Sequence, residues 1–245
     1  MGIFDRVRGF SESRRSSRME KATRVASNPK ASKEDRMASL QLLASLDDGS
    51  EAVKRLLPRF NFSLEHGIID TREKEVAMTG ILRFEKSAIP MLQDWIKASS
   101  KIAWPIKILK KLGSDEEVVD VLKSALVFED VSFDQGATDK NYDILCYLRD
   151  YKLGDFSMEL VKLIQASDER VRFACVEALI EQRNQELAPA LEHFMVDHSS
   201  ENIRIRQSVI KAFQELSWKV SNVGKIAEAA EGIHVLKDGT IRVHG

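Results

Sequence analysis

The chain has 245 residues, of which 43% are hydrophobic, so it can bury a substantial core. Five prolines and twelve glycines are too few for a turn-rich β protein of this length, and the net charge of −1 gives no overall attraction to nucleic acid or anionic membranes. The charge is unevenly distributed, because residues 1–36 hold ten Lys and Arg against five Asp and Glu, while the remainder holds 27 against 33. A basic N-terminal arm therefore precedes an acidic body.

Two cysteines, Cys146 and Cys175, fall inside apolar helical patterns, where we expect both to be small core residues. Their spacing suggests neither a disulfide framework nor a metal site, which favours a reducing, cytoplasmic setting. No run of eighteen apolar residues is present, so the sequence predicts no membrane span. The N-terminus lacks the apolar segment of a secretory signal, and Arg6 stands where a myristoylation motif needs Ser or Thr.

The arm, residues 1–30, begins with Ile3, Phe4, Val7 and Phe10 at helical spacing, which predicts a short amphipathic helix over residues 3–10. The polar, basic stretch SESRRSSR follows and is expected to be mobile. The simplest interpretation is a frayed tail. The alternatives are a docking helix for a partner or a weak contact of residues 3–10 with a membrane surface.

Between residues 31 and 231 apolar residues recur at helical spacing, and polar or glycine-containing breaks divide them into about six pairs of helices. Residues 129–138 are expected to form a loop insertion, and the last helix, near residues 220–230, is short and suits a terminal cap. The predicted helix starts up to the fifth pair lie at or near Ser32, Ser50, Thr71, Ser87, Ile102, Ser114, Tyr142, Asp155 or Ser157, and Asp168.

The clearest repetition lies between Asp168 and Phe213. Residues 171–179 and 205–213 both have the form V/I-R-x-x-(small)-x-x-A-L/F, with Arg172 and Arg206 at the same position in each. A second apolar helical pattern separates the two segments. A period in the thirties with two amphipathic helices in each period is typical of an α-solenoid, in which stacked neighbours close one core.

The last fourteen residues, 232–245, predict a β-hairpin. Asp238-Gly239 lies between two short apolar runs, and an Asp-Gly pair in that position is a strong hairpin indication. Because an isolated hairpin is marginal in water, we expect this one to pack on the last helices or to pair with another strand.

The two V/I-R-x-x-(small)-x-x-A-L/F segments resemble HEAT repeats of the PBS-lyase HEAT-like kind, and the layout is similar to bacterial HEAT-repeat proteins. The resemblance is specific over residues 167–216 and weaker over 33–166. It implies an all-α, right-handed solenoid of about six helix pairs, with a concave face lined by the second helices, here those around Trp95, Leu122, Leu160 and Leu191. It also implies a ladder between repeats in which Asp168 and Asp197 meet Arg172 and Arg206. The alternative for those residues is a set of solvated surface pairs.

A search for chemistry finds no nucleotide-binding, metal-binding or nucleophile motif, so we expect no catalytic, cofactor or metal site. The most basic and aromatic part of the body is a candidate interaction surface of Trp95, Lys101, Trp104, Lys107 and Lys111. HEAT-like alkylpurine DNA glycosylases use Trp, Asp and Arg on a basic concave face, and the three tryptophans invite that comparison. None of them matches the glycosylase motif residue by residue, and the acidic body disfavours DNA.

The sequence therefore predicts a non-enzymatic, cytoplasmic scaffold or adaptor that binds a protein partner through the concave face of a HEAT-like solenoid. The alternative is a HEAT-like DNA-binding protein or alkylpurine DNA glycosylase. The domain order is a basic arm at 1–30, a solenoid at 31–231 and a hairpin at 232–245.

Overall fold

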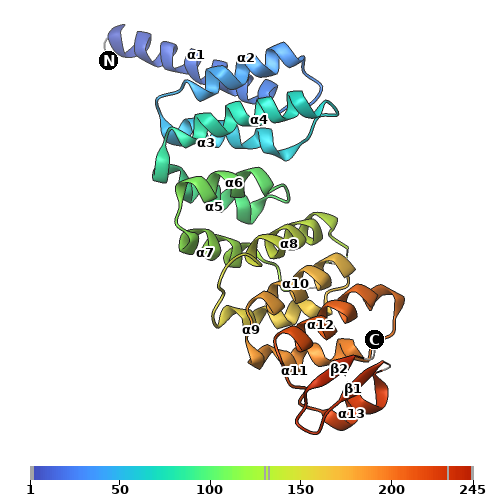
Figure 1. Ribbon diagram of the computed structural model, residues 1–245. Helices are drawn as coiled ribbons and strands as arrows, with labels where there is room; N and C mark the ends of the chain where they lie inside the picture. Colours follow the sequence, from blue (N-terminus) through green and yellow to red (C-terminus); the bar gives the residue numbers. More distant parts are fainter. Residues whose placement is uncertain (1–2, 130, 132, 231, 244–245) are drawn as a thin grey trace. The chain divides into compact units, whose positions relative to one another are not determined.

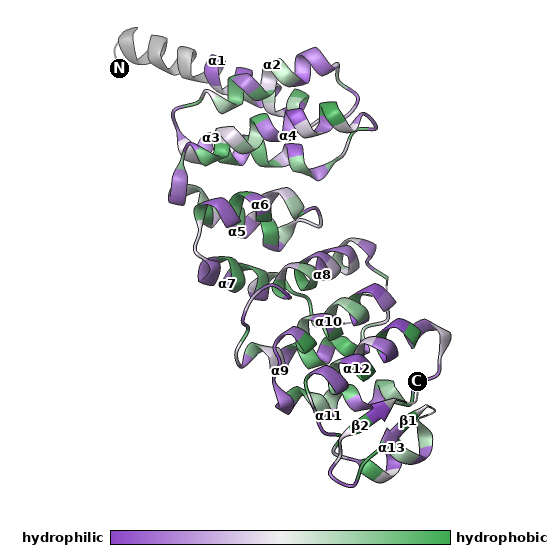
Figure 2. Cartoon of the chain, in the orientation of Figure 1, coloured by the Kyte–Doolittle hydropathy of each residue, from purple (hydrophilic) through white to green (hydrophobic). Residues whose placement is uncertain are grey.

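A computed structural model describes residues 3–129, 131, 133–230 and 232–243, and within these the side chains of residues 3–13 and 243 are not described (Figure 1). The described chain is mostly helical with one two-stranded sheet, which confirms the all-α prediction. It divides into two compact units, Met1–Ala125 and Leu126–Gly245, which we describe separately. Most helices carry both hydrophobic and hydrophilic residues (Figure 2), as helices half covered by neighbours do.

Unit 1 is built from helices packed in two rows. Helix α2 packs against α1 and α4, and α4 packs against α6, while α3 contacts α5 and α5 contacts α7. The helices are α1 (Ile3–Ala26), α2 (Lys33–Ala44), α3 (Gly49–Leu56), α4 (Gly67–Leu82), α5 (Ile89–Ala98), α6 (Ala103–Leu112) and α7 (Asp115–Ala125), with 3₁₀-helices η1 (Leu57–Asn61) and η2 (Glu85–Ala88).

The arm differs from its prediction, because one continuous helix, α1, replaces the short helix and mobile stretch. Its second half buries Met19, Ala22 and Ala26 in the core of unit 1, so apolar burial extends the helix across the polar segment. The predicted membrane-surface contact of residues 3–10 rests on side chains outside the described ones. No described helix is long and apolar enough to cross a membrane.

Local capping sets several helix starts. The side chain of Ser32 accepts a hydrogen bond from the Asp35 amide at 3.0 Å, as expected for the start of α2. The predicted cap of α3 is wrong, because Asp48 accepts from the Glu51 amide at 3.0 Å and Ser50 lies inside the helix. An acidic cap two residues earlier therefore starts this helix.

Three other starts also differ from the sequence prediction. Helix α4 begins at Gly67 instead of Thr71, and α5 follows Ala88 after a 3₁₀ turn instead of a cap at Ser87. Helix α8 begins at Gln135, inside the predicted insertion, because Asp134 caps it by accepting from the Ala137 amide at 3.0 Å. Helices α4 and α8 therefore start earlier than the apolar pattern predicts, while the 3₁₀ turn delays the start of α5.

Unit 2 repeats the row arrangement, with α8 packed against α10 and α10 against α12. The opposing helices are divided into short α and 3₁₀ segments. Its helices are α8 (Gln135–Leu148), α9 (Phe156–Leu160), η3 (Val161–Gln165), α10 (Glu169–Glu181), η4 (Gln185–Leu187), α11 (Ala188–Leu191), η5 (Glu192–Met195), η6 (Ser200–Asn202), α12 (Ile203–Glu215) and α13 (Val223–Ala229).

The C-terminal hairpin is confirmed. Strands β1 (Ile233–Val235) and β2 (Ile241–Val243) pair antiparallel with His234 opposite Arg242. Gly239 adopts a φ of +86° in the turn, and a Cβ there would lie 2.7 Å from the Val220 carbonyl oxygen. The Val220 amide donates to the Gly239 carbonyl at 2.9 Å, and β2 packs on α12. The turn therefore docks on the end of the helical body, as the sequence predicts.

Candidate functional site

An apolar surface groove in unit 1 runs between α2 and α4 and has a volume of about 490 Å³. Its floor is formed by small or β-branched residues, and polar side chains stand along its rim. The lining residues are Gln41, Ala44, Ser45, Arg72, Glu75, Val76, Thr79, Gly80 and Arg83. On α4 the positions 72, 76, 79 and 83 recur at intervals of three and four, so they form one stripe of the helix.

Gly80 decides how closely the walls of this groove approach. A Cβ at Gly80 would lie 2.7 Å from the Cβ of Ala44 and 2.8 Å from Cδ1 of Leu56, closer than real contacts allow. Arg36 and Glu73 meet near the starts of α2 and α4, and Ala44 and Gly80 meet near their ends, so the two helices run parallel. The groove is therefore a shallow, open depression along two parallel helices that approach closely at Ala44 and Gly80.

A buried ion network fixes α4 to α2 and η1. Glu73 is fully buried, and its carboxylate accepts hydrogen bonds from Nε of Arg36 at 3.1 Å and from Nε of Arg59 at 2.9 Å. Arg59 also binds Asp70 at 2.7 Å, and Asp70 binds Nζ of Lys74 at 2.7 Å. Three cations and two carboxylates are thus paired inside unit 1, so the loss of either carboxylate leaves a buried charge without a partner.

The pKa of Asp70 is lowered by its partners in this network. Burial acts to raise its pKa, but hydrogen bonds from Lys74, Arg59 and the Leu64 amide outweigh burial and hold the pKa below its ordinary value. Asp70 therefore stays ionised at neutral pH and holds the first turn of α4. This anchoring explains why α4 begins before Thr71.

Arg36 connects two parts of unit 1. Its Nη1 donates to the carbonyl of Pro29 at 3.3 Å and to the carbonyl of Ala31, which hold the loop before α2. Its Nε and Nη2 reach Glu73 on the next helix of the row. The side chain therefore clamps its own entry loop and the neighbouring helix together.

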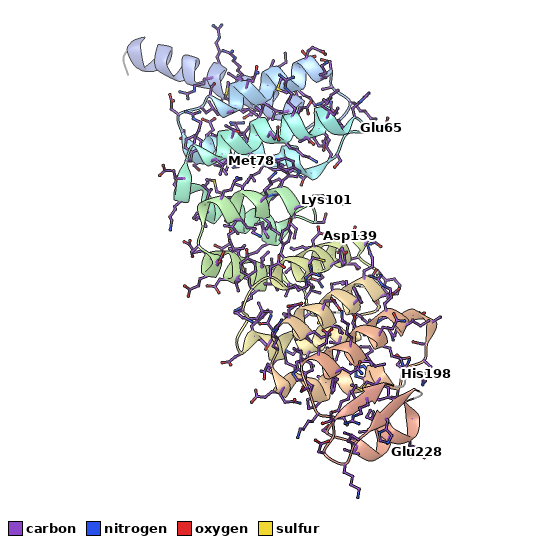
Figure 3. All side chains as sticks on the ribbon, in the orientation of Figure 1. Glu65, Met78, Lys101, Asp139, His198 and Glu228 are labelled. Atoms are coloured by element: carbon purple, nitrogen blue, oxygen red, sulfur yellow. The ribbon has the colours of Figure 1, made fainter. Side chains whose placement is uncertain are left out.

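The predicted surface of Trp95, Lys101, Trp104, Lys107 and Lys111 lies within unit 1, but its tryptophans are engaged in packing. Trp104 stacks on Phe60 with ring centroids 6.1 Å apart, and the Lys107 amine lies 4.6 Å from its centroid. Trp95 packs on the core, and its Nε1 is buried with no hydrogen-bond partner among the described residues. Lys101, Lys107 and Lys111 are exposed, and Lys101 stands in the turn before α6 (Figure 3).

The third tryptophan, Trp218, is 3% exposed in unit 2 and meets Phe213 edge to face at 5.5 Å. All three tryptophans therefore take part in packing between helices. The rings contribute to the cores of their units, while the lysines near Trp104 supply the exposed charge of the predicted surface.

The predicted ladder residues lie in unit 2, but Asp168 and Arg172 do not pair with each other. Asp168 binds Arg170 at 3.0 Å and caps α10, while Arg170 also reaches Asp139 of α8 at 3.1 Å, an acid marked in Figure 3. Arg172 donates to the carbonyls of Ala166 and Ser167, both at 2.8 Å. The predicted pair does not form because Arg170 binds Asp168, while Arg172 binds the loop that precedes its own helix.

Asn202 supplies the link between helices that was expected from Asp197. Its side-chain oxygen accepts from Nε of Arg172 at 3.2 Å, and its amide donates to Asp197 at 2.6 Å. Arg206 donates to the Met195 carbonyl at 2.9 Å. The four predicted residues thus hold successive helices of unit 2 in place, with Asn202 as the bridge that sequence reasoning missed. The available indication was its place in the repeat, since Asn202 precedes Arg206 by the same interval as Asp168 precedes Arg172.

Other buried or half-buried polar side chains of unit 2 hold loops against helices. Asn141 binds both the amide and the carbonyl of Val127, at 3.0 and 2.7 Å. Gln182 accepts from the Leu153 amide at 2.9 Å and donates to the Tyr151 carbonyl at 3.0 Å. Glu192 accepts at 2.9 Å from the Ser221 hydroxyl and also from the Ser221 amide. These groups stabilise connections between helices.

The two cysteines differ. Cys175 is buried as predicted, and burial raises the pKa of its thiol. The prediction for Cys146 is wrong, because it lies on the exposed side of α8. A position on an apolar helix stripe does not guarantee burial where no neighbouring helix covers it.

Within the described ranges, no group of three or more His, Cys, Asp or Glu side chains could hold a metal ion. Comparison with known proteins finds no family model that matches the chain. No curated protein and no solved structure matches it either.

Proposed function

We propose that the chain is a non-enzymatic scaffold that binds a protein partner, built as a right-handed α-solenoid of about six HEAT-like helix pairs. The observation that supports it best is the row packing inside each unit, where α2, α4 and α6 contact in order and α8, α10 and α12 do the same. Such rows leave one stripe of every helix uncovered, which gives a long surface for docking.

The residues that begin and end α10 and α12 recur at one interval, which supports the proposed repeat. Arg183 and Ser217 end α10 and α12 with positive φ values of +52° and +53°. Asp168 and Asn202 precede the same two helices, and the interval between them equals the interval between Arg183 and Ser217. Recurrence of both ends of the helix at one period is what a structural repeat requires.

The contacts of Arg36 in unit 1 resemble those of Arg172 in unit 2, which extends the proposed repeat to unit 1. Arg36 and Arg172 both lie in the first turn or two of a first helix, and both donate to carbonyls five to seven residues upstream. Both then reach toward the next helix of the row, Arg36 to Glu73 and Arg172 to Asn202. We therefore place α2 in the same register as α10.

Protein is the partner class we favour because the apolar groove between α2 and α4 is ready-made for side chains of another chain. The concave face expected from the second helices remains a second docking surface. The three tryptophans that invited the comparison with DNA glycosylases take part in packing, so the interpretation as a scaffold in the cytoplasm is preferred.

Photo-cross-linking in cells tests this proposal. A benzoylphenylalanine would be placed at exposed positions of the groove (Thr79), of the second helices (Asp94, Asp120, Glu159) and of the hairpin turn as a control (Lys237). We expect discrete, nuclease-resistant protein adducts from groove or second-helix positions and none from the control. Adducts that nuclease removes, or equal labelling at all five positions, would refute a protein-binding scaffold.

A further inference from the structure

The groove between α2 and α4 has a charge pattern that specifies its occupant. Arg72, Glu75 and Arg83 stand on its rim in the order positive, negative, positive, and all three are exposed. At roughly 1.5 Å per helical residue, Arg72 and Arg83 are about 16 Å apart along α4, with Glu75 about 4.5 Å from Arg72. This spacing corresponds to three turns of a second helix.

Two of these charges have no partner among the side chains that the structure describes. Arg72 and Glu75 form no ion pair or side-chain hydrogen bond with any described residue. Arg83 donates to the Ala44 carbonyl at the end of α2 and lies over the Phe84 ring at 5.6 Å, which holds its side chain at the end of the groove. The rim therefore presents Arg83 in a fixed position and two charged side chains, Arg72 and Glu75, that are available to form ion pairs with another chain.

The floor favours a helix over an extended strand. Ala44 and Gly80 bring α2 and α4 close together and leave a shallow channel without long side chains. A third helix can lay one ridge of side chains into such a channel, as ridges of one helix fill grooves between others. A volume of about 490 Å³ accommodates a few aliphatic side chains.

The charge of unit 1 supports an acidic occupant. By sequence, residues 1–125 hold 23 Lys and Arg against 18 Asp and Glu, a net charge of +5, while residues 126–245 hold 14 against 20. An anionic segment therefore gains from the field of unit 1 as well as from the two rim arginines.

We propose that the groove binds an amphipathic helix of a protein partner with a carboxylate near each end and a basic residue between them. This rests on the proposed protein-binding function and names the chemistry of the partner. Its small apolar side chains lie against Ala44, Val76 and Gly80, its two acids pair with Arg72 and Arg83, and its cation pairs with Glu75. A helix with the inverted charge pattern is repelled by Arg72, Glu75 and Arg83, so the groove selects its partner by repulsion as well as by attraction.

The probe is a stapled 16-residue helical peptide with Glu at positions 2 and 13 and Ala or Leu on the rest of one face. Two versions carry Lys at position 5 or 10, one for each orientation, and a charge-inverted peptide is the control. Fluorescence anisotropy with the full chain at low salt is expected to show one Lys version binding about 10-fold tighter than the inverted peptide. Equal binding of all peptides would overturn the proposal.

Variants separate the groove from other surfaces. Thr79→Trp fills the groove from an exposed position and is expected to abolish peptide binding, while Thr71→Trp, exposed on the same helix but outside the lining, leaves it unchanged. Arg72→Glu is expected to weaken binding several-fold without changing the circular dichroism melt. Binding that survives Thr79→Trp contradicts the proposal.

Two further outcomes keep this inference distinct from the proposed function. Self-association of the chain that Thr79→Trp removes would make a second copy the occupant and overturn the assignment to a partner helix. Protein adducts from cross-linkers at Asp94 or Asp120 but not at Thr79 would leave the scaffold function standing and reject the groove as its site.

Discussion

The buried carboxylate of Glu73 is the group on which unit 1 depends most for a fixed arrangement of α2, η1 and α4. We consider the substitution Glu73→Gln, which keeps the side-chain volume and removes the charge. Glu73 is fully buried and is bound by Arg36 at 3.0 and 3.1 Å and by Arg59 at 2.9 Å. With Gln in place, three buried or nearly buried cations face the single carboxylate of Asp70.

Loss of one partner from a buried ion pair costs about 3–5 kcal/mol, because the remaining charge cannot regain its hydration. Gln retains one acceptor for the guanidinium groups, so we expect the lower end of that range, about 3 kcal/mol. At a urea m-value of about 1–3 kcal/mol/M, this shifts the unfolding midpoint of unit 1 by roughly 1–3 M. The effect should be confined to unit 1.

Urea unfolding followed by tryptophan fluorescence measures this change. A Trp218→Phe background removes the tryptophan of unit 2 and leaves Trp95 and Trp104 as reporters of unit 1. Glu75→Gln is the matched control, an exposed carboxylate two residues away on the same helix, and should change stability by less than about 0.5 kcal/mol. A loss below about 1 kcal/mol for Glu73→Gln would refute the reasoning that the network holds α4 in place.

Three other predictions concern single positions. The pKa of Asp70 is lower in the folded than in the unfolded chain, so the ionised carboxylate stabilises unit 1 above the unfolded pKa near 3.9. This stabilisation is lost as the pH falls through the folded pKa. In an acid titration, the Asp70→Asn variant should therefore lose less stability in unit 1 below about pH 4 than the parent chain does. Gly80→Ala should destabilise unit 1 by about 1–3 kcal/mol in thermal melts because its Cβ meets Ala44, while Gly67→Ala, which meets nothing within 4 Å, should be neutral or stabilising. Ser217→Gly should raise the stability of unit 2 by up to about 1 kcal/mol, since Ser217 holds a φ of +53°, and an unchanged melting curve would contradict that source of strain.

The helical content and the hairpin could be predicted because both are encoded in short-range patterns. Apolar residues at helical spacing mark most helices, and Ser114, at the predicted start of α7, forms a reciprocal cap with Glu117 at 3.2 and 2.7 Å. Asp238-Gly239 marks the hairpin turn in the same way. These features depend on neighbours within a few residues, which a single sequence displays.

Contacts between residues far apart in the sequence could not be predicted as well. The sequence offered Asp168 and Asp197 as partners of the repeat arginines and did not indicate Asn202, which accepts a hydrogen bond from Arg172. The same limit concealed the contact between Arg36 and Glu73. Several acids lie within sequence reach of each arginine, and only the crossing of the helices brings one of them within hydrogen-bond distance.

For the candidate site, the sequence identified exposed lysines near Trp104 but not the groove between α2 and α4. Composition and periodicity by themselves determine that this chain forms amphipathic helices with a terminal hairpin, because each element satisfies its own backbone hydrogen bonds. Tertiary structure decides which helices become parallel neighbours, and therefore that Ala44 meets Gly80 and that Arg72 and Glu75 are left facing solvent. Close packing between residues far apart in the sequence creates that surface, and no local pattern records it.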